Sequence, residues 1–267
     1  MNRLADKVAV VTGTSPNIGG TLAHGLAAEG ARVVCTDLSA EVVADSAAKI
    51  VADGGDAIAV AGDVTDPDHA DEAVAAALAR WGRIDILVNN AVFFKQQGVL
   101  TMSYEDYRRQ LDVVLGGAFL FTRAVARSMI DAGTPGSIVN VLSTAAWQGQ
   151  PGNIGYSTGK SGLVNFTRSA AMELAEYGIR VNGFTPTATA PTDPAARVQM
   201  QELLDRPCQY RMDFAGQIPL SRLPTPADYV GAIVFLASDE AAMITGTNIT
   251  VDGGATAKYW PWTPHPA

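Results

Sequence analysis

Cysteine and histidine are scarce in this chain of 267 residues, and their scarcity bears on two kinds of site. The two cysteines, Cys35 and Cys208, are far apart and match no disulfide or metal-ligand spacing. His24, His69 and His265 stand singly and form no ligand pattern. We therefore expect no metal site, and we interpret Cys35, which falls in an expected strand, as a buried and inert thiol.

Basic residues and long hydrophobic runs are also in short supply. Nineteen lysines and arginines face 27 acidic residues, giving a net charge of −8, which argues against nucleic acid or an anionic membrane surface as a partner. No segment of the sequence reads as a membrane span, and the N-terminal stretch MNRLADKVAVVTG lacks the apolar core and cleavage site of a signal peptide. We expect a soluble, cytoplasmic protein.

Aromatic residues make up only 7% of the chain, whereas alanine, valine and glycine are abundant and apolar residues reach 48%. This composition and length suit one large α/β domain, in which short apolar runs form a parallel sheet covered by helices. Strands are expected at 7–12, 32–36, 57–61, 84–88, 138–142, 179–184 and 248–251. Helices are expected from the early twenties to Gly30 and at 39–53, 67–81, 104–129, 156–177 and 227–236.

The first expected strand is followed by the glycine-rich stretch GTSPNIGG and then by a helix. A strand, a tight turn and a helix N-terminus together can hold a pyrophosphate, because backbone N–H groups and the helix dipole face the anion. Gly13, Asn17, Ile18 and Gly19 are the candidate contacts. The alternative is a glycine-rich turn that binds nothing.

Asp37 ends the second expected strand, twenty-four residues after Gly13. A carboxylate there can accept hydrogen bonds from both adenosine-ribose hydroxyls of NAD and repels the additional phosphate of NADP. No lysine or arginine occurs at 14–20 or 36–40 to neutralise such a phosphate. The pattern favours NAD, although Asp37 could also serve as an acid at a helix N-terminus.

Residues 143–160 carry the candidate chemistry. Ser143 follows an apolar strand, and Tyr156 and Lys160, four residues apart, share one face of a helix. A nearby ammonium favours the phenolate and brings the high pKa of a tyrosine towards neutrality, so the tyrosine can act as an acid or base while the serine holds a substrate oxygen. A half-buried tyrosine beside a solvated lysine is the plain structural alternative.

With these motifs in one order, residues 7–254 resemble the short-chain dehydrogenase/reductase family. The resemblance implies one doubly wound Rossmann-type domain over 1–254 with a seven-stranded parallel sheet, and NAD-dependent interconversion of a secondary alcohol and a ketone by Ser143, Tyr156 and Lys160. It implies cofactor contacts from Gly13, Asn17, Ile18, Gly19, Asp37, Asp63, Val64, Asn90, Tyr156, Lys160, Pro186 and Thr189, with Asn89 stabilising the sheet. It also implies a homotetramer formed through 104–129 and 156–177, although these helices could simply cover one face of the sheet.

Four positions depart from the family pattern: Asn17 and Val92 stand for glycines, Thr187 for the glycine after Pro186, and Val114 for an asparagine that links the lysine to solvent through water. We expect Asn17 to tolerate the left-handed backbone of the turn. Two alternatives stay open: a cofactor-binding protein with vestigial catalysis, and a cofactor-free enzyme resembling halohydrin dehalogenases. The catalytic residues of that subgroup resemble a Ser-Tyr-Arg arrangement, whereas this chain has Lys160 in place of the arginine.

The segment 187–221 shows no dominant period and is expected to be a substrate loop that is mobile without ligand. Phe93, Trp147 and Tyr210 are candidate substrate contacts, with core packing as the alternative for each. The aromatic and proline-rich tail, 255–267, is expected either to be disordered or to pack on another subunit.

Overall fold

The computed structural model describes residues 2–192, 197–198 and 215–259. Its centre is a parallel sheet of seven strands in the order β3-β2-β1-β4-β5-β6-β7. The strands are β1 (Val8–Thr12), β2 (Arg32–Asp37), β3 (Asp56–Ala61), β4 (Ile86–Asn89), β5 (Gly136–Val141), β6 (Ile179–Pro186) and β7 (Asn248–Val251). The expected Rossmann-type fold is therefore confirmed.

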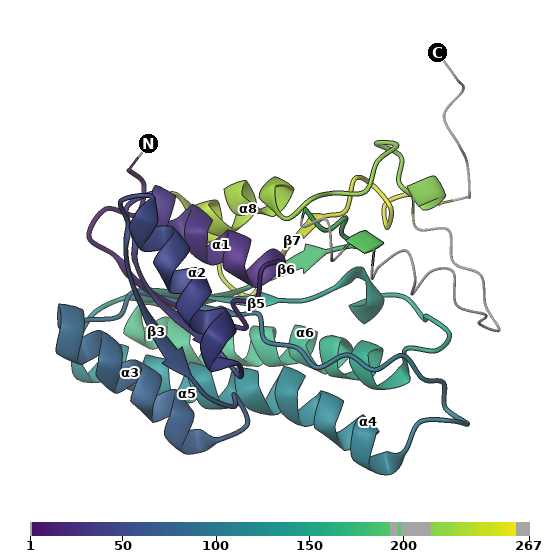
Figure 1. Cartoon of the computed structure of the whole chain (residues 1–267), viewed down its shortest axis with the longest axis horizontal. Coiled ribbons are helices and arrows are strands. Elements are labelled where there is room, and N and C mark those ends of the chain that lie inside the picture. Colours follow the sequence, from purple (N-terminus) through teal and green to yellow (C-terminus); the bar gives the residue numbers. More distant parts are fainter. Residues whose placement is uncertain (1, 193–196, 199–214, 260–267) are drawn as a thin grey trace.

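Helices cover both faces of the sheet, as Figure 1 shows, with α1, α2 and α8 on one side and α3 to α6 on the other. Their bounds are α1 (Ile18–Ala28), α2 (Ala40–Ala52), α3 (Pro67–Trp81), α4 (Tyr104–Leu111), α5 (Gly117–Asp131), α6 (Ile154–Leu174) and α8 (Ala227–Ala237). Because both faces are covered, strands such as β1 and β4 are buried at every position, which explains their continuous apolar sequences.

The expected helix 104–129 is interrupted. Between α4 and α5 the chain forms a π-helical turn, Asp112–Gly116, that periodicity alone did not predict. Val114, one of the four departures, lies in this turn and packs with Leu142, Leu163 and Val164. A π-helical turn inserts an additional residue into a helix and often marks a functional site, and this turn faces α6, which carries Tyr156 and Lys160.

The run Tyr104–Asp131 is long and apolar enough to cross a membrane by length and composition alone, so the expectation that no segment has these properties was too strict. More than half of its most apolar window is buried in the fold. Phe121, Val125 and Met129 pack with the sheet residues Val8, Leu87 and Ile138 in one core cluster, which explains the apolar composition as that of a core helix.

Buried amides join the central strands to α6. The Nδ2 of Asn89, on β4, donates to the Oδ1 of Asn140, on β5, at 2.8 Å. The Nδ2 of Asn140 in turn donates to the hydroxyl of Thr167, on α6, at 3.0 Å, and that hydroxyl donates to the carbonyl of Leu163. Fully buried amides require such partners, and this chain of bonds fixes α6 against the strand that leads to Ser143. The sheet-stabilising role expected of Asn89 matches these contacts.

Candidate active site

The loop between β1 and α1 has a geometry that only glycine permits at two positions. Gly13 has a φ of +70°, and a Cβ on Gly19 would lie 2.0 Å from the carbonyl oxygen of Gly13. Within the described residues, no side chain caps the first turn of α1, and that turn holds no acidic residue. The N–H of Gly20 donates to the carbonyl of Ser15 at 2.9 Å. The N–H groups of Ile18 and Gly19 and the positive end of the helix dipole are left to an anion, as a dinucleotide pyrophosphate requires.

Asn17 does not adopt the left-handed backbone that we expected, because its φ is −137°. The left-handed residue of this turn is Gly13 instead. A second side chain braces the loop: the Nδ2 of Asn90 donates to the carbonyl of Gly13 at 2.8 Å, and the backbone N–H of Asn90 donates to the hydroxyl of Thr12 at 3.0 Å. Asn90 therefore shapes the glycine turn from β4.

Asp37 lies half-buried at the carboxyl end of β2, where its carboxylate accepts the N–H of Ser39 at 3.3 Å. Asp63 follows β3 and is bound by Arg109 of α4 at 2.6 Å and by Thr65. Partial burial raises the pKa of Asp63, but the hydrogen bonds from Thr65 and Arg109 outweigh it and hold this pKa below its ordinary value. Val64, beside Asp63, is buried against Gly117.

Ser143, Tyr156 and Lys160 meet where β5 ends against α6. The Nζ of Lys160, which is 3% exposed, donates to the carbonyl of Val141 at 2.5 Å and lies 5.7 Å from the ring centroid of Tyr156. The hydroxyl of Ser143 accepts the N–H of Ala145 at 3.2 Å, so its proton remains available to Tyr156 or to a ligand.

The pKa shifts of Tyr156 and Lys160 differ from our expectation that a charged lysine lowers the pKa of the tyrosine. Desolvation raises the pKa of Tyr156, and a hydrogen bond from Ser143 opposes this. Burial also lowers the pKa of Lys160 to about 7, since its main partner is a neutral carbonyl. Lys160 is therefore poised between its charged and neutral forms near neutral pH, and an additional polar ligand beside it would favour the charged form.

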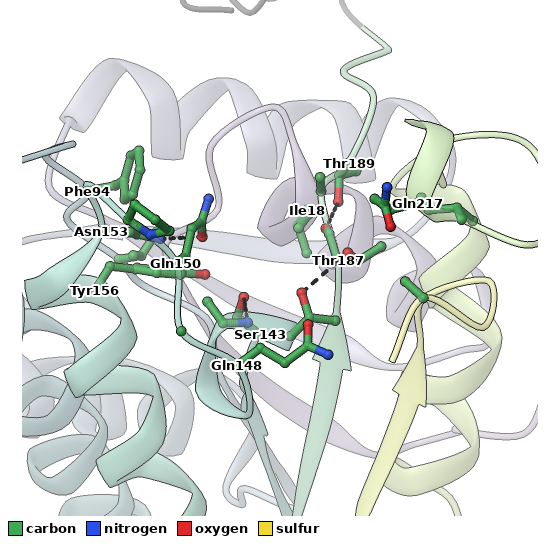
Figure 2. Close-up of a pocket in the computed structure, with 18 of the residues that line it drawn as sticks. Ile18, Phe94, Ser143, Gln148, Gln150, Asn153, Tyr156, Thr187, Thr189 and Gln217 are labelled. Atoms are coloured by element: carbon green, nitrogen blue, oxygen red, sulfur yellow. Dashed lines mark hydrogen bonds between the residues drawn. The ribbon is translucent and has the colours of Figure 1, made fainter. Parts of the chain in front are cut away.

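Ser143 and Tyr156 open into a cavity of about 850 Å³ (Figure 2). Its walls combine the glycine loop, the segment after β5, the start of α6, the segment after β6 and the segment after β7. The lining residues are Asn17, Ile18, Val92, Phe94, Ser143, Thr144, Ala145, Gln148, Gly149, Gln150, Pro151, Asn153, Tyr156, Thr187, Ala188, Thr189, Gln217, Ile218, Ala255, Lys258 and Tyr259. The cavity thus joins the candidate catalytic groups to the candidate cofactor loop.

Two of the three substrate candidates, Phe93 and Trp147, are not among the described residues that line this cavity. Phe94 takes the place of its neighbour Phe93, with its ring edge-on to Tyr156 at a centroid distance of 5.4 Å. Trp147 turns away, 44% exposed, and its Nε1 donates to the hydroxyl of Thr185 at 3.4 Å beside a smaller cavity. Tyr210 lies outside the described residues, as does most of the expected substrate loop.

The segment after β6 is held by a residue that sequence reasoning missed. Pro186 ends β6, and the hydroxyl of Thr189 donates to the carbonyl of Thr187 at 2.8 Å. The hydroxyl of Tyr229, a fully buried residue of α8, lies 2.7 Å from that of Thr189. Tyr229 therefore supports the wall formed by Thr187 and Thr189. A tyrosine at the start of the apolar run that follows Asp228 was the available signal, because a buried hydroxyl requires a partner.

Cys35 and Val114 are both core residues. Cys35 is fully buried in β2, which confirms the buried thiol, and burial raises the pKa of this thiol to about 11, as expected of an inert one. Val114 is 2% exposed, and its side chain lies against Gly159, the residue before Lys160. A valine cannot replace the hydrogen bonds of an asparagine there, but it packs the π-helical turn directly onto the helix that carries the lysine.

The fold and site together define a dinucleotide-dependent oxidoreductase class, and comparisons with known proteins agree. A family model described as enoyl-(acyl carrier protein) reductase matches residues 13–256. The chain is 39% identical over 256 residues to a 3-oxoacyl-[acyl-carrier-protein] reductase of Synechocystis sp., covering 95% of this chain and 98% of that protein. It is 39% identical over 255 residues to an L-rhamnose 1-dehydrogenase (NAD(P)(+)) of Azotobacter vinelandii, covering 94% and 97%.

Among solved structures, it is similar to a provisionally designated NAD(P)-dependent gluconate 5-dehydrogenase from Beutenbergia cavernae, which holds NADP at low occupancy. The TM-score is 0.83 and the identity 35%, over 96% of this chain and 98% of that one. The chain belongs to the short-chain dehydrogenase/reductase family. It is an oxidoreductase acting on alcohol or ketone substrates, in a family that uses NAD or NADP.

Burial of Lys160 predicts a pH-dependent stability difference. Its pKa is about 7 in the folded protein and about 10.4 in an unfolded chain, so the cost of burying the ammonium is full below pH 7 and disappears as pH rises towards 10.4. Lys160→Met removes this cost. The difference in free energy of unfolding, Lys160→Met minus wild type, should therefore be larger at pH 6 than at pH 10 by more than about 1 kcal/mol. Urea titrations at both pH values measure this.

Lys49→Met, on the exposed surface of α2, is the matched control and should show no such dependence on pH. A difference between Lys160→Met and wild type that stays constant from pH 6 to pH 10 would contradict the lowered pKa.

Proposed function

We propose that the protein catalyses NAD-dependent interconversion of a secondary alcohol and a ketone. The observation that carries this proposal is the convergence of Ser143 and Tyr156 on one cavity with the glycine loop, with Lys160 buried behind them. When bound, NAD accepts or returns the hydride of the carbinol carbon. The protein positions the substrate oxygen and moves the proton.

In the oxidation direction, Tyr156 is the base that takes the hydroxyl proton of the alcohol, and in reduction it is the acid that returns a proton. The hydroxyl oxygen of Ser143 accepts the N–H of Ala145, so the hydroxyl proton can be donated to the substrate oxygen. Lys160, charged when a polar ligand lies beside it, would stabilise the phenolate and would hold a ribose hydroxyl of the cofactor. Phe94, edge-on to the ring of Tyr156, lines the same cavity.

NAD is proposed as the cofactor because Asp37 stands at the end of β2 with one hydrogen bond, from Ser39. Gly13, Asn17, Ile18 and Gly19 are proposed to hold the pyrophosphate. Asp63, Val64 and Asn90 are proposed along the adenosine half, and Tyr156, Lys160, Pro186 and Thr189 along the nicotinamide half. One relative is named for both NAD and NADP and one similar structure holds NADP, so the preference for NAD over NADP is tested by kinetics with both cofactors.

A cofactor-binding protein with vestigial catalysis is the second candidate, and buried Val114 favours it because an apolar side chain stands where the family relays protons to Lys160. The dehalogenase-like alternative is less well supported. The loop keeps Gly13 and Gly19, Asp37 ends β2, and Lys160 stands where that subgroup has an arginine. A wild-type protein that binds NAD but oxidises nothing across a broad panel of alcohols would favour the vestigial reading.

We further propose a cytoplasmic homotetramer, with residues 1–254 as the catalytic domain and 255–267 as a C-terminal tail. Exposed apolar side chains on α4, α5 and α6, which form the expected interface, support the assembly. They are Tyr104 at the start of α4, Phe119 on α5 and Met172 on α6.

Replacing Tyr156 by phenylalanine should lower kcat by about 10²–10⁴-fold while leaving NAD affinity nearly unchanged, because the change removes the proton and little volume. Steady-state kinetics on an oxidised alcohol and NAD titration by fluorescence measure the two quantities. Phe94→Leu serves as a control for aromatic packing beside the ring. Retention of more than about a tenth of kcat in Tyr156→Phe would assign the proton transfer to another residue.

Asp37→Ala should narrow the preference for NAD over NADP by at least about tenfold in kcat/KM, since it removes both the ribose contacts and the repulsion of the 2′-phosphate. Kinetics with the two cofactors at one alcohol concentration measure the ratio, and Asp45→Ala on α2 is the matched control. Equal kcat/KM for NAD and NADP in the wild type would refute the assignment.

A further inference from the structure

The cavity contains one cation. Among its described lining residues Lys258 is the single charged side chain, and the others are apolar groups, hydroxyls and the amides Asn17, Gln148, Gln150, Asn153 and Gln217. This is unexpected in a chain whose acidic residues outnumber its basic ones by 27 to 19. A buried or half-buried cation ordinarily has an acidic partner, so a lone lysine in a ligand cavity indicates an anionic ligand.

Lys258 is held in place by neighbours rather than by a counter-ion. Its Nζ donates to the carbonyl oxygen of Gln217 and, at 3.0 Å, to the Oε1 of the same residue. Across the part of the chain that the structure describes, no carboxylate lies within ion-pair distance of this Nζ. An ammonium has three donors, so Lys258 can still donate to a ligand without giving up either bond to Gln217.

The nearest acid in the sequence is occupied by its own turn. Asp252 is buried after β7 and accepts the N–H of Gly254 at 2.9 Å, the N–H of Thr256 at 2.8 Å and the hydroxyl of Thr256 at 2.6 Å. These bonds fix the turn from which Lys258 projects. Gly253, with φ at +61°, packs against Ile218 of the opposite wall. The lysine therefore sits on a structured support.

Lys258 shares its cavity with Asn17 and Ile18 of the glycine loop, but the sheet order places it far from Asp37. Asp37 ends β2 and the glycine loop follows β1, whereas Ser143 follows β5 and Lys258 follows β7 at the far edge of the sheet. A dinucleotide that extends from Asp37 past the glycine loop towards Ser143 runs in the direction of Lys258 without requiring it for its phosphates. The glycine loop can hold the cofactor phosphates through its own backbone, so a group of the substrate is the anion considered for Lys258, and a cofactor phosphate is the competing outcome of the test.

We propose that the substrate is a secondary alcohol that bears a carboxylate, and that Lys258 binds this carboxylate while Ser143 and Tyr156 bind the hydroxyl. A single cation matches a monoanion better than a phosphate dianion, which commonly takes several donors and charges. This inference rests on the proposed function and adds the substrate class to it.

The test compares hydroxy acids with their primary carboxamides, which keep the shape and lose the charge. The probes are 3-hydroxybutanoate, 4-hydroxypentanoate, 5-hydroxyhexanoate and 4-hydroxycyclohexanecarboxylate, each with its amide, assayed by NADH formation. In the wild type the best acid should exceed its amide in kcat/KM by about tenfold or more, and Lys258→Met should reduce this ratio to about one. Lys258→Arg should retain part of the preference, and Lys49→Met on α2 all of it.

Two results would overturn the proposal while the proposed function stands: amides oxidised as well as acids by the wild type, or a preference for acids that survives in Lys258→Met. A loss of NAD affinity in Lys258→Met with an unchanged acid-to-amide ratio would assign the lysine to a cofactor phosphate and would also overturn it.

Calorimetric titration of the same acids and amides into the NAD-loaded protein provides a readout that does not need turnover. Tighter binding of an acid than of its amide, lost in Lys258→Met, supports the carboxylate site even if no alcohol is oxidised and the proposed function fails. Equal binding of the acids and amides refutes the site.

Discussion

The hydrogen bond from the buried ammonium of Lys160 to the carbonyl of Val141 is the contact on which the site depends. It joins α6 to the last residue of β5, two positions before Ser143, and thereby sets the serine and Tyr156 at one end of the cavity. The same burial that permits this contact lowers the pKa of Lys160 to about 7. Burying the ammonium destabilises the folded protein, but it makes the protonation state of Lys160 sensitive to a polar group that binds beside it.

The rest of the sheet supplies a rigid frame for that contact. The amides of Asn89 and Asn140 link β4 and β5 to Thr167 on α6, so the helix that carries Tyr156 and Lys160 is fixed at two levels. At the carboxyl edge, the Asn90 side chain braces Gly13, and Tyr229 braces Thr189 from α8. Loops at this edge differ from the family pattern at Asn17, Val92 and Thr187, and all three residues line the cavity. Three of the four departures therefore lie on the cavity wall, while the side chains that brace this wall, Asn90 and Tyr229, are polar and half-buried or buried.

Most of the fold could be predicted from the sequence because the central strands, such as β1 and β4, are buried on both faces and read as short apolar runs. The order of Ser143, Tyr156 and Lys160 and the glycine turn could be predicted because their chemistry depends on local spacing. Other features depend on contacts between distant segments. The π-helical turn forms where Val114 packs on Gly159, and the selection of Phe94 over Phe93 depends on which ring the loop directs at Tyr156. Trp147 was misplaced because its partner, Thr185, is thirty-eight residues away. Lys258 escaped notice because nothing near it in the sequence marks a cavity.

The most direct test of the central claim follows the hydrogen of the carbinol carbon. A secondary alcohol that the protein oxidises, deuterated at that carbon, is incubated with NAD, and the reduced cofactor is analysed by mass spectrometry and proton NMR. Direct hydride transfer from an alcohol held by Ser143 and Tyr156 predicts one deuterium in each molecule of NADH, on a single face of the nicotinamide ring. NADH without deuterium, or consumption of the alcohol without reduction of NAD, would contradict the account.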